Sequence, residues 1–268
     1  MSGQPRPAIE EIADERIAIF NEIVRTHQVD ALKIRRLQNR LEKLISSSNV
    51  EPIVRSIFNH ELAYLYAYRG MTAEASACFN EAGDFGLTGV SLSLSRAHTS
   101  YLCGNIKESA RQAKRHSSSA SGDHEIGNLV VLCIQAGLFI MADNILKGMT
   151  TAEQPYVHIA SAILERLGCS ESDVTERLQV AADVIKTSIK HPLMSYSLLA
   201  MEGEGILYRF VVRAGIDEIV ALDRAIDRAL SERFDADNSE LDQFLSIGVK
   251  PYTAGADLNI EAAGNVYL

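Results

Sequence analysis

Hydrophobic residues recur at three- and four-residue spacing through most of this chain, the period of an amphipathic helix. The opening segment shows the pattern twice, from Ile12 to Val24 and again from Leu32 to Ile45. Strict alternation over four or more residues is rare, and so is proline, so strand signals are weak. The pattern predicts an all-α protein.

Glycines divide the middle of the chain into units of nearly constant length. Gly70, Gly104 and Gly137 each end one helical run and precede another, at spacings of 34 and 33 residues. A glycine suits the turn between two antiparallel helices, and a small residue on the second helix allows close packing. Small residues stand five positions after each glycine, at Ala75, Ser109 and Ala142.

The segment 56–89 resembles a tetratricopeptide repeat (TPR), a 34-residue helix–turn–helix unit. It carries seven residues of that signature in register: Leu62, Ala63, Tyr66, Gly70, Ala75, Phe79 and Ala82. The unit at 90–123 keeps Ala97 and Gly104, with Ser109 and Ala113 replacing the usual residues, and the third, to about residue 155, keeps Leu129, Gly137, Ala142 and Leu146. The resemblance fades beyond residue 155. It implies a right-handed α-solenoid of stacked antiparallel helix pairs.

We therefore expect one continuous solenoid in four parts. These are a capping helix pair at 1–48, TPR-like repeats at 49–155, divergent helical repeats with a C-terminal cap at 156–247, and an irregular tail at 248–268. In the third part the pattern predicts a helix pair over 156–185, whose second helix follows a capping box at Ser170 and Asp173. It also predicts helices over 193–213, 217–234 and 239–247.

The tail is more apolar than a free tail needs to be, with Leu258, Ile260 and Val266 among its residues. Two interpretations stay open. The tail folds back along the solenoid, or it is a short exposed element that docks elsewhere.

In this family the first helix of each pair lines the concave surface, which implies a set of partner-binding side chains. Some relatives grip a partner's terminal carboxylate there with Lys, Asn and Arg, and that clamp is missing at the corresponding positions of this chain. An aromatic, weakly charged groove suits protein or peptide recognition. Alternatively, Tyr64 and Tyr68 pack against the neighbouring repeat. The implied positions are His60, Tyr64, Tyr68, Leu94, His98, Tyr101, His124, Val131 and Gln135.

Composition and charge narrow the class of partner. The hydrophobic fraction of 47% and the charged fraction of 23% are ordinary for a globular protein. The net charge is −9, and an acidic surface repels phosphate backbones, which disfavours nucleic acid. The longest apolar run, 129–142, is shorter than the ~20 residues of a membrane-spanning helix, and the N-terminus has no apolar signal core. We expect a cytoplasmic protein that binds no membrane.

No motif for catalysis, metal or cofactor binding stands out. Glu202 and Glu204 lie two apart in a predicted helix, so they would point to different faces, and the glycines beside them would mark a close helix crossing. His116 and His124 have no further ligand three or four residues away. The four cysteines are far apart with no CxxC pair, which favours buried thiols.

The sequence therefore predicts a non-enzymatic adaptor or regulator that holds a protein or peptide on a TPR-like solenoid. Two alternatives stay open. One is an assembly protein that forms homo-oligomers, and the other is a sensor that regulates a partner when a peptide or small ligand binds.

Overall fold

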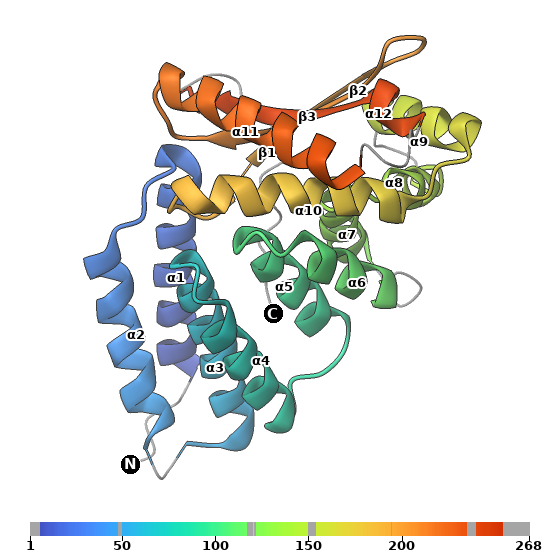
Figure 1. The fold of residues 1–268 in the computed structure, drawn as a ribbon. Helices are drawn as coiled ribbons and strands as arrows, with labels where there is room; N and C mark the ends of the chain where they lie inside the picture. Colours follow the sequence, from blue (N-terminus) through green and yellow to red (C-terminus); the bar gives the residue numbers. More distant parts are fainter. Residues whose placement is uncertain are drawn as a thin grey trace.

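The computed structural model describes residues 6–47, 50–116, 120, 122–149, 154–193, 195–234 and 240–253, and these residues are mostly helical. Helices fill the first two thirds of the chain, as the periodicity predicts (Figure 1). The first eight are α1 (Arg6–Thr26), α2 (Ala31–Ile45), α3 (Pro52–Tyr68), α4 (Thr72–Asp84), α5 (Val90–Leu102), α6 (Ile106–His116), α7 (Asp123–Gln135) and α8 (Phe139–Leu146).

These eight helices pack as consecutive pairs. The first helices of the pairs are neighbours, since α1 contacts α3, α3 contacts α5, and α5 contacts α7. We call α1, α3, α5 and α7 the first-helix row. The second helices, α2, α4 and α6, each pack against their own first helix and the next one. Gly70, Gly104 and Gly137 occupy the turns within the pairs with φ of 71°, 82° and 77°, which confirms the predicted turns.

Helix α10 (Glu171–Ser188) crosses the ends of two pairs. A Cβ atom on Gly104 would lie 2.9 Å from Cγ of Lys186, and one on Gly137 would lie 2.7 Å from Cγ1 of Val174. The two glycines therefore allow α10 to approach the turns as well as allowing the turns to form. The predicted capping box starts this helix, with Ser170 and Asp173 bonding reciprocally. Helix α9 (Pro155–Leu167) packs mainly on α8 and on the sheet described next.

The predicted helix over 193–213 is wrong. Ser195–Met201 and Gly205–Val212 are antiparallel strands β1 and β2, joined by a tight turn. The predicted helix over 239–247 is also mostly wrong, because α12 (Leu241–Phe244) is one turn long and leads into β3 (Leu245–Pro251). The irregular tail predicted from residue 248 is therefore wrong at 248–251, which belong to β3. The rest of the predicted tail from residue 254 lies outside the described residues.

The three strands form a sheet of order β1-β2-β3, in which β3 is parallel to β2. The crossover between them contains α11 (Ile216–Phe234), which confirms the predicted helix over 217–234. One face of β2, formed by Ile206, Tyr208, Phe210 and Val212, is fully buried. Tyr208 Oη donates to the carbonyl of Gln135 at 3.1 Å, which fixes this face against the end of α7.

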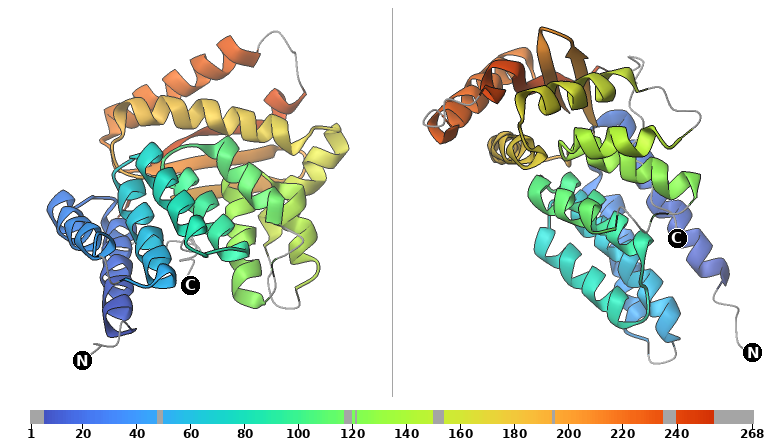
Figure 2. Two further views of the ribbon diagram at one scale, coloured as in Figure 1. Left: turned by 90° about the horizontal axis from the view of Figure 1, so that it is seen from below. Right: turned by 90° about the vertical axis from the view of Figure 1, so that its right-hand side faces the viewer.

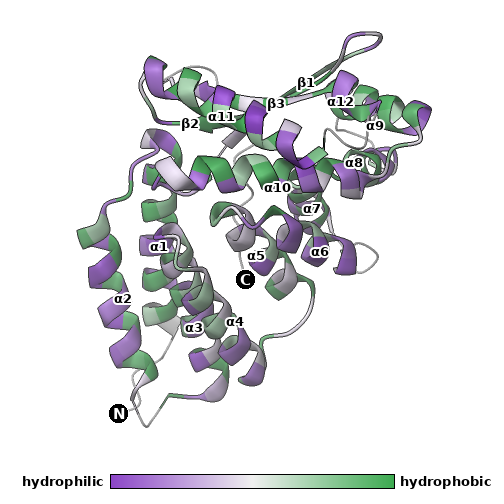
Figure 3. Cartoon of the chain, in the orientation of Figure 1, coloured by the Kyte–Doolittle hydropathy of each residue, from purple (hydrophilic) through white to green (hydrophobic). Residues whose placement is uncertain are grey.

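Two apolar cores result. One joins α1–α4 to part of α5, and the other extends from α5 through α10 to the sheet and α11. Figure 2 shows the sheet and α11 stacked over α10 at one end of the helix pairs, and Figure 3 shows polar residues along the outer sides of α2, α4 and α6. The described residues contain no helix long and apolar enough to cross a membrane. All four cysteines are free thiols.

Candidate functional site

The structure buries eight of the nine side chains that the resemblance assigns to a partner-binding groove. His124 is the exposed one. Tyr64 packs against His98 of the neighbouring pair, with ring centroids 5.8 Å apart, as the alternative interpretation expected. None of the eight offers an open surface in this structure, so their role toward a partner stays a prediction. The buried residues are His60, Tyr64, Tyr68, Leu94, His98, Tyr101, Val131 and Gln135.

Four of these residues meet around a buried ion pair that the sequence pattern did not indicate. Arg16 Nε of α1 donates to Glu61 Oε2 of α3 at 2.5 Å, and the two side chains are only 2% and 5% exposed. The other carboxylate oxygen lies 3.0 Å from Nδ1 of His60, whose Nε2 lies 2.9 Å from Ser95 Oγ of α5. A continuous polar chain therefore links the first three helices of the first-helix row.

Several buried polar atoms beside this chain of hydrogen bonds have no hydrogen-bond partner of their own. The Arg16 guanidinium lies over the Tyr64 ring at 4.7 Å, and Phe20 stacks on Tyr68 and meets His98 edge-on. We call Arg16, His60, Glu61, Tyr64, Tyr68, Ser95 and His98 the polar cluster. Buried polar groups are nearly always paired, and each unpaired one costs about 1–3 kcal/mol. The unpartnered atoms of the cluster are Arg16 Nη1, the hydroxyls of Tyr64 and Tyr68, and both ring nitrogens of His98.

The charge state of the cluster follows from its contacts. Burial opposes ionisation of Glu61, but Arg16 and the hydrogen bond with His60 outweigh it and lower the pKa of Glu61 to about 2. Burial and the Arg16 charge lower the pKa of His98 to about 3, and burial raises the pKa of Tyr68 to about 12. Glu61 and Arg16 are therefore charged at neutral pH, while His98 and the tyrosines are neutral. Of the unpartnered atoms, Arg16 Nη1 can only donate, the two hydroxyls can donate or accept, and the neutral His98 ring has one donor and one acceptor nitrogen. An acceptor oxygen would therefore match Arg16 Nη1 first.

His98 makes stability depend on pH. Its folded pKa is lowered, so only the unfolded chain gains its proton between pH 6.5 and about 3, and stability falls as the pH drops through that range. We expect His98→Phe to reduce the loss of unfolding free energy between pH 7.5 and 5.0 by about 2 kcal/mol. Urea titrations at the two pH values measure this. His124→Phe, at an exposed site, is the control. If the free energy of unfolding falls equally between pH 7.5 and 5.0 in the two variants, the prediction is contradicted.

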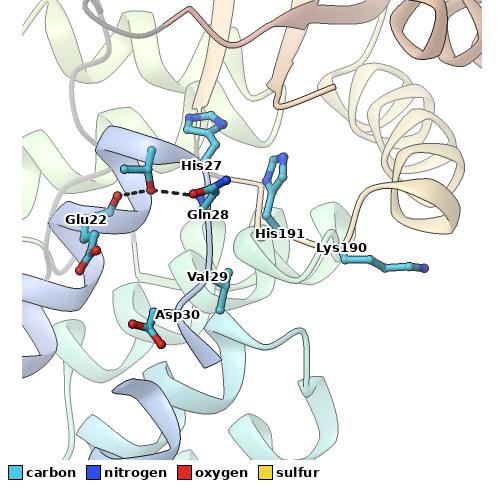
Figure 4. A pocket seen from close by; sticks show the side chains of 8 residues that line it. Glu22, His27, Gln28, Val29, Asp30, Lys190 and His191 are labelled. Carbon is cyan, nitrogen blue, oxygen red and sulfur yellow. Dashed lines mark hydrogen bonds between the residues drawn. The ribbon is translucent and has the colours of Figure 1, made fainter. Parts of the chain in front are cut away.

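A second site lies where distant segments meet at the C-terminal end of α1. A cavity of about 540 Å³ is lined by residues 22 and 26–30 together with Lys190 and His191 (Figure 4). His27 has φ of +48°, its Nε2 lies 3.2 Å from Ser195 Oγ, and its ring stacks on Tyr252 at 4.3 Å. Nothing in the sequence indicated this junction, because the three segments are far apart along the chain.

The acidic groups of this cavity already have partners. Glu22 bonds Lys33 at 2.9 Å, and Asp30 Oδ1 caps α2 by accepting from two backbone amides, those of Leu32 and Lys33. Arg213 Nη1 donates to the carbonyl of Thr26, which fixes the end of β2 to α1. These contacts join the segments around the cavity to one another and leave its acidic groups paired within the protein. We therefore take the polar cluster as the better candidate for a binding site.

The structure places Glu202 and Glu204, which the sequence analysis weighed as possible catalytic acids, in the turn between β1 and β2 and not in a helix. Glu202 and Glu204 are exposed in this turn, so the expectation that they lie on different faces of a helix is wrong. Within the described ranges, no three His, Cys, Asp or Glu side chains are grouped so that they could hold a metal ion. Comparisons with protein-family models, curated proteins and solved structures each returned no match to this chain.

Proposed function

We propose that this protein is a cytoplasmic adaptor or regulator, built as a TPR-like solenoid, whose first-helix row binds an extended segment of a protein or peptide partner. The observation that carries the proposal is Arg16 Nη1, a buried donor without a hydrogen-bond partner, which lies on α1 beside Tyr64 and Tyr68 of the adjacent helix α3. A partner that brings an acceptor oxygen would satisfy this donor, which costs free energy while it is unpaired.

Two further features support this proposal over a purely structural role for the cluster. The ion pair of Arg16 and Glu61 holds the guanidinium through Nε, which leaves Nη1 without a protein partner. The Tyr64 ring lies 4.7 Å from the guanidinium carbon, and rigid aromatic side chains give large contact area at low entropic cost. A peptide side chain with a carboxylate or amide fits these groups, whereas a phosphate backbone is repelled by the net charge of −9.

The test removes two hydroxyls and leaves the rings. We expect Tyr64→Phe combined with Tyr68→Phe to weaken partner binding about tenfold or more, since each lost hydrogen bond is worth about 0.5–1.5 kcal/mol. The partner is captured with the wild-type protein and identified by mass spectrometry, and its affinity for each variant is measured by calorimetry.

Tyr66→Phe is the matched control on the same helix. Its hydroxyl donates to Glu42 at 2.9 Å and takes no part in the polar cluster. We expect this variant to bind the partner within about twofold of wild type, because no donor of the cluster changes. Equal affinity of the double variant and the control would show that the hydroxyls do not contact the partner.

A further inference from the structure

A further cavity lies between α10, α11 and the start of β3, on elements that take no part in the polar cluster (Figure 1). Its volume is about 310 Å³. Buried side chains form its floor, among them Arg177, Phe234 and Ile247, whereas Asp227 and Ser231 on its rim are exposed. The cavity therefore opens to solvent and is large enough for a small molecule.

The outer edge of β3 borders this cavity, and its backbone groups alternate in direction. Tyr252 donates its N–H to the carbonyl of Val212 in β2 at 2.8 Å, so the even-numbered residues of β3 direct their N–H and C=O groups to β2. The odd-numbered residues direct theirs away from β2. Val249 agrees with this alternation, because its N–H donates to Asp223 Oδ1 of α11 at 2.7 Å. The N–H and C=O groups of Ile247 therefore point out of the sheet edge, toward the cavity that Ile247 lines.

One amide of this edge is left without an acceptor in the described part of the chain. The N–H of Leu245 donates to the carbonyl of Leu241, and that of Val249 donates to α11. Ile247 lies between them, is 4% exposed, and its N–H has no acceptor among the described residues, although buried amides are nearly always paired. An opening of one residue is too short for an added β-strand, but it suits a small molecule that accepts one hydrogen bond.

Arg177 supplies a second donor to the same cavity. Its Nε donates to Asp242 Oδ1 at 2.6 Å, and its Nη1 donates to the carbonyl of Asp173 at 3.2 Å. Its guanidinium carbon lies 4.2 Å from the centroid of the Phe234 ring, so the group is held in one orientation. Its Nη2 has no partner among the described residues. A guanidinium and a backbone N–H are both good donors to a carboxylate, so this part of the cavity suits one.

Helix α11 supplies a negative charge on the rim of the cavity. Asp227 forms no ion pair with a described residue, whereas the charge of Asp242 is already matched by Arg177. Asp227, Leu230 and Phe234 recur at three- and four-residue spacing, so they share one face of α11. The cavity thus combines donors for a carboxylate, an acid for a cation and an apolar wall. Two acids beside one arginine disfavour a simple anion.

We propose that this cavity binds a free α-amino acid with an apolar side chain. The carboxylate of the ligand accepts from the N–H of Ile247 and from Arg177 Nη2, and its ammonium group donates to Asp227. Its side chain lies against Leu230 and Phe234. The ligand bridges α10, α11 and β3, so it stabilises the folded protein by mass action. This site is separate from the polar cluster, and neither proposal depends on the other.

Isothermal titration calorimetry of the full chain tests the chemistry of the ligand. The probes are L-leucine, L-methionine and L-phenylalanine, and we expect at least one of them to bind with a Kd of about 1 mM or below. The N-acetyl derivative of that amino acid lacks the ammonium charge, and its amide lacks the carboxylate. Each derivative should bind at least about tenfold more weakly, because a charged hydrogen bond is lost. If none of the three probes binds, or if either derivative binds as tightly as its parent, the proposal is overturned.

Variants of the protein test the position of the site. Asp227→Asn removes the proposed partner of the ammonium group and should weaken binding at least about tenfold. Asp217→Asn is the matched control, at an exposed position in the first turn of the same helix, and should bind within about twofold of wild type. Ser231→Phe should fill the cavity and abolish binding, with circular dichroism to show that the chain folds. If that chain does not fold, the two aspartate variants decide the test. Equal affinities of Asp227→Asn and Asp217→Asn would place the amino acid elsewhere and overturn the proposal.

Discussion

Replacing Glu61 by alanine is expected to lower the free energy of unfolding by about 3–5 kcal/mol, because it leaves Arg16 charged in a buried site without its partner. Both side chains of this pair are almost completely buried. His60 loses the group that holds its Nδ1, so the chain of hydrogen bonds to Ser95 is weakened as well. Urea denaturation at neutral pH, followed by circular dichroism, measures the change.

An exposed pair gives the control. Glu22 and Lys33 lie 2.9 Å apart, but each side chain is 41% exposed, so we expect Glu22→Ala to cost less than about 1 kcal/mol. Replacing both buried partners, with Arg16→Met and Glu61→Leu, should be much less harmful than Glu61→Ala alone, since no uncompensated charge remains. A loss below 1 kcal/mol for Glu61→Ala would mean that water reaches Arg16.

The helix pairs could be predicted from the sequence because their signals are local. An apolar period of three to four residues specifies each helix, and Gly70, Gly104 and Gly137 mark turns that only a few residues determine. What the period did not show is how the pairs continue after α8. Helix α10 packs across the turns at Gly104 and Gly137, and this contact joins residues far apart in the sequence.

The hairpin was missed because its residues suit two structures. Ile206, Tyr208, Phe210 and Val212 alternate as a half-buried strand does, but the residues between them include Leu207 and Val211, so the run also resembles a buried helix. The pairing of β2 with β3 decides between the two, and β3 lies some forty residues further along. The glycines at 203 and 205 were the usable signal, since closely spaced glycines favour a turn.

The candidate site was predicted in part. Repeat spacing selected Tyr64, Tyr68 and His98, which the structure does bring together. It could not select Arg16 of α1, which pairs with Glu61 of α3, 45 residues further along and beyond the intervening helix α2. The burial of these side chains could not be predicted either, because it depends on every element that packs against the first-helix row. The position of a residue on a helix does not tell an open groove from a covered one.

Gly205→Ala is expected to lower the free energy of unfolding by about 3 kcal/mol or more. Gly205 starts β2 with φ of +124°, where residues with a side chain are strained. A Cβ atom there would lie 2.4 Å from the carbonyl oxygen of Phe244, just before β3. This neighbour is backbone and cannot rotate away, so the strands must separate or the turn must rebuild. Thermal unfolding, with urea titration for the free energy, measures the loss.

Gly203→Ala separates the two causes. Gly203 also has positive φ, at +80°, but a Cβ atom there meets nothing within 4 Å. We expect this change to cost about 1 kcal/mol, from backbone strain alone. If both variants lose the same amount, the close approach of Phe244 adds no cost, and the parallel pairing of β2 with β3 is looser than the register implies. A larger loss for Gly205→Ala means that one glycine permits the sheet to form where the sequence pattern suggested a helix.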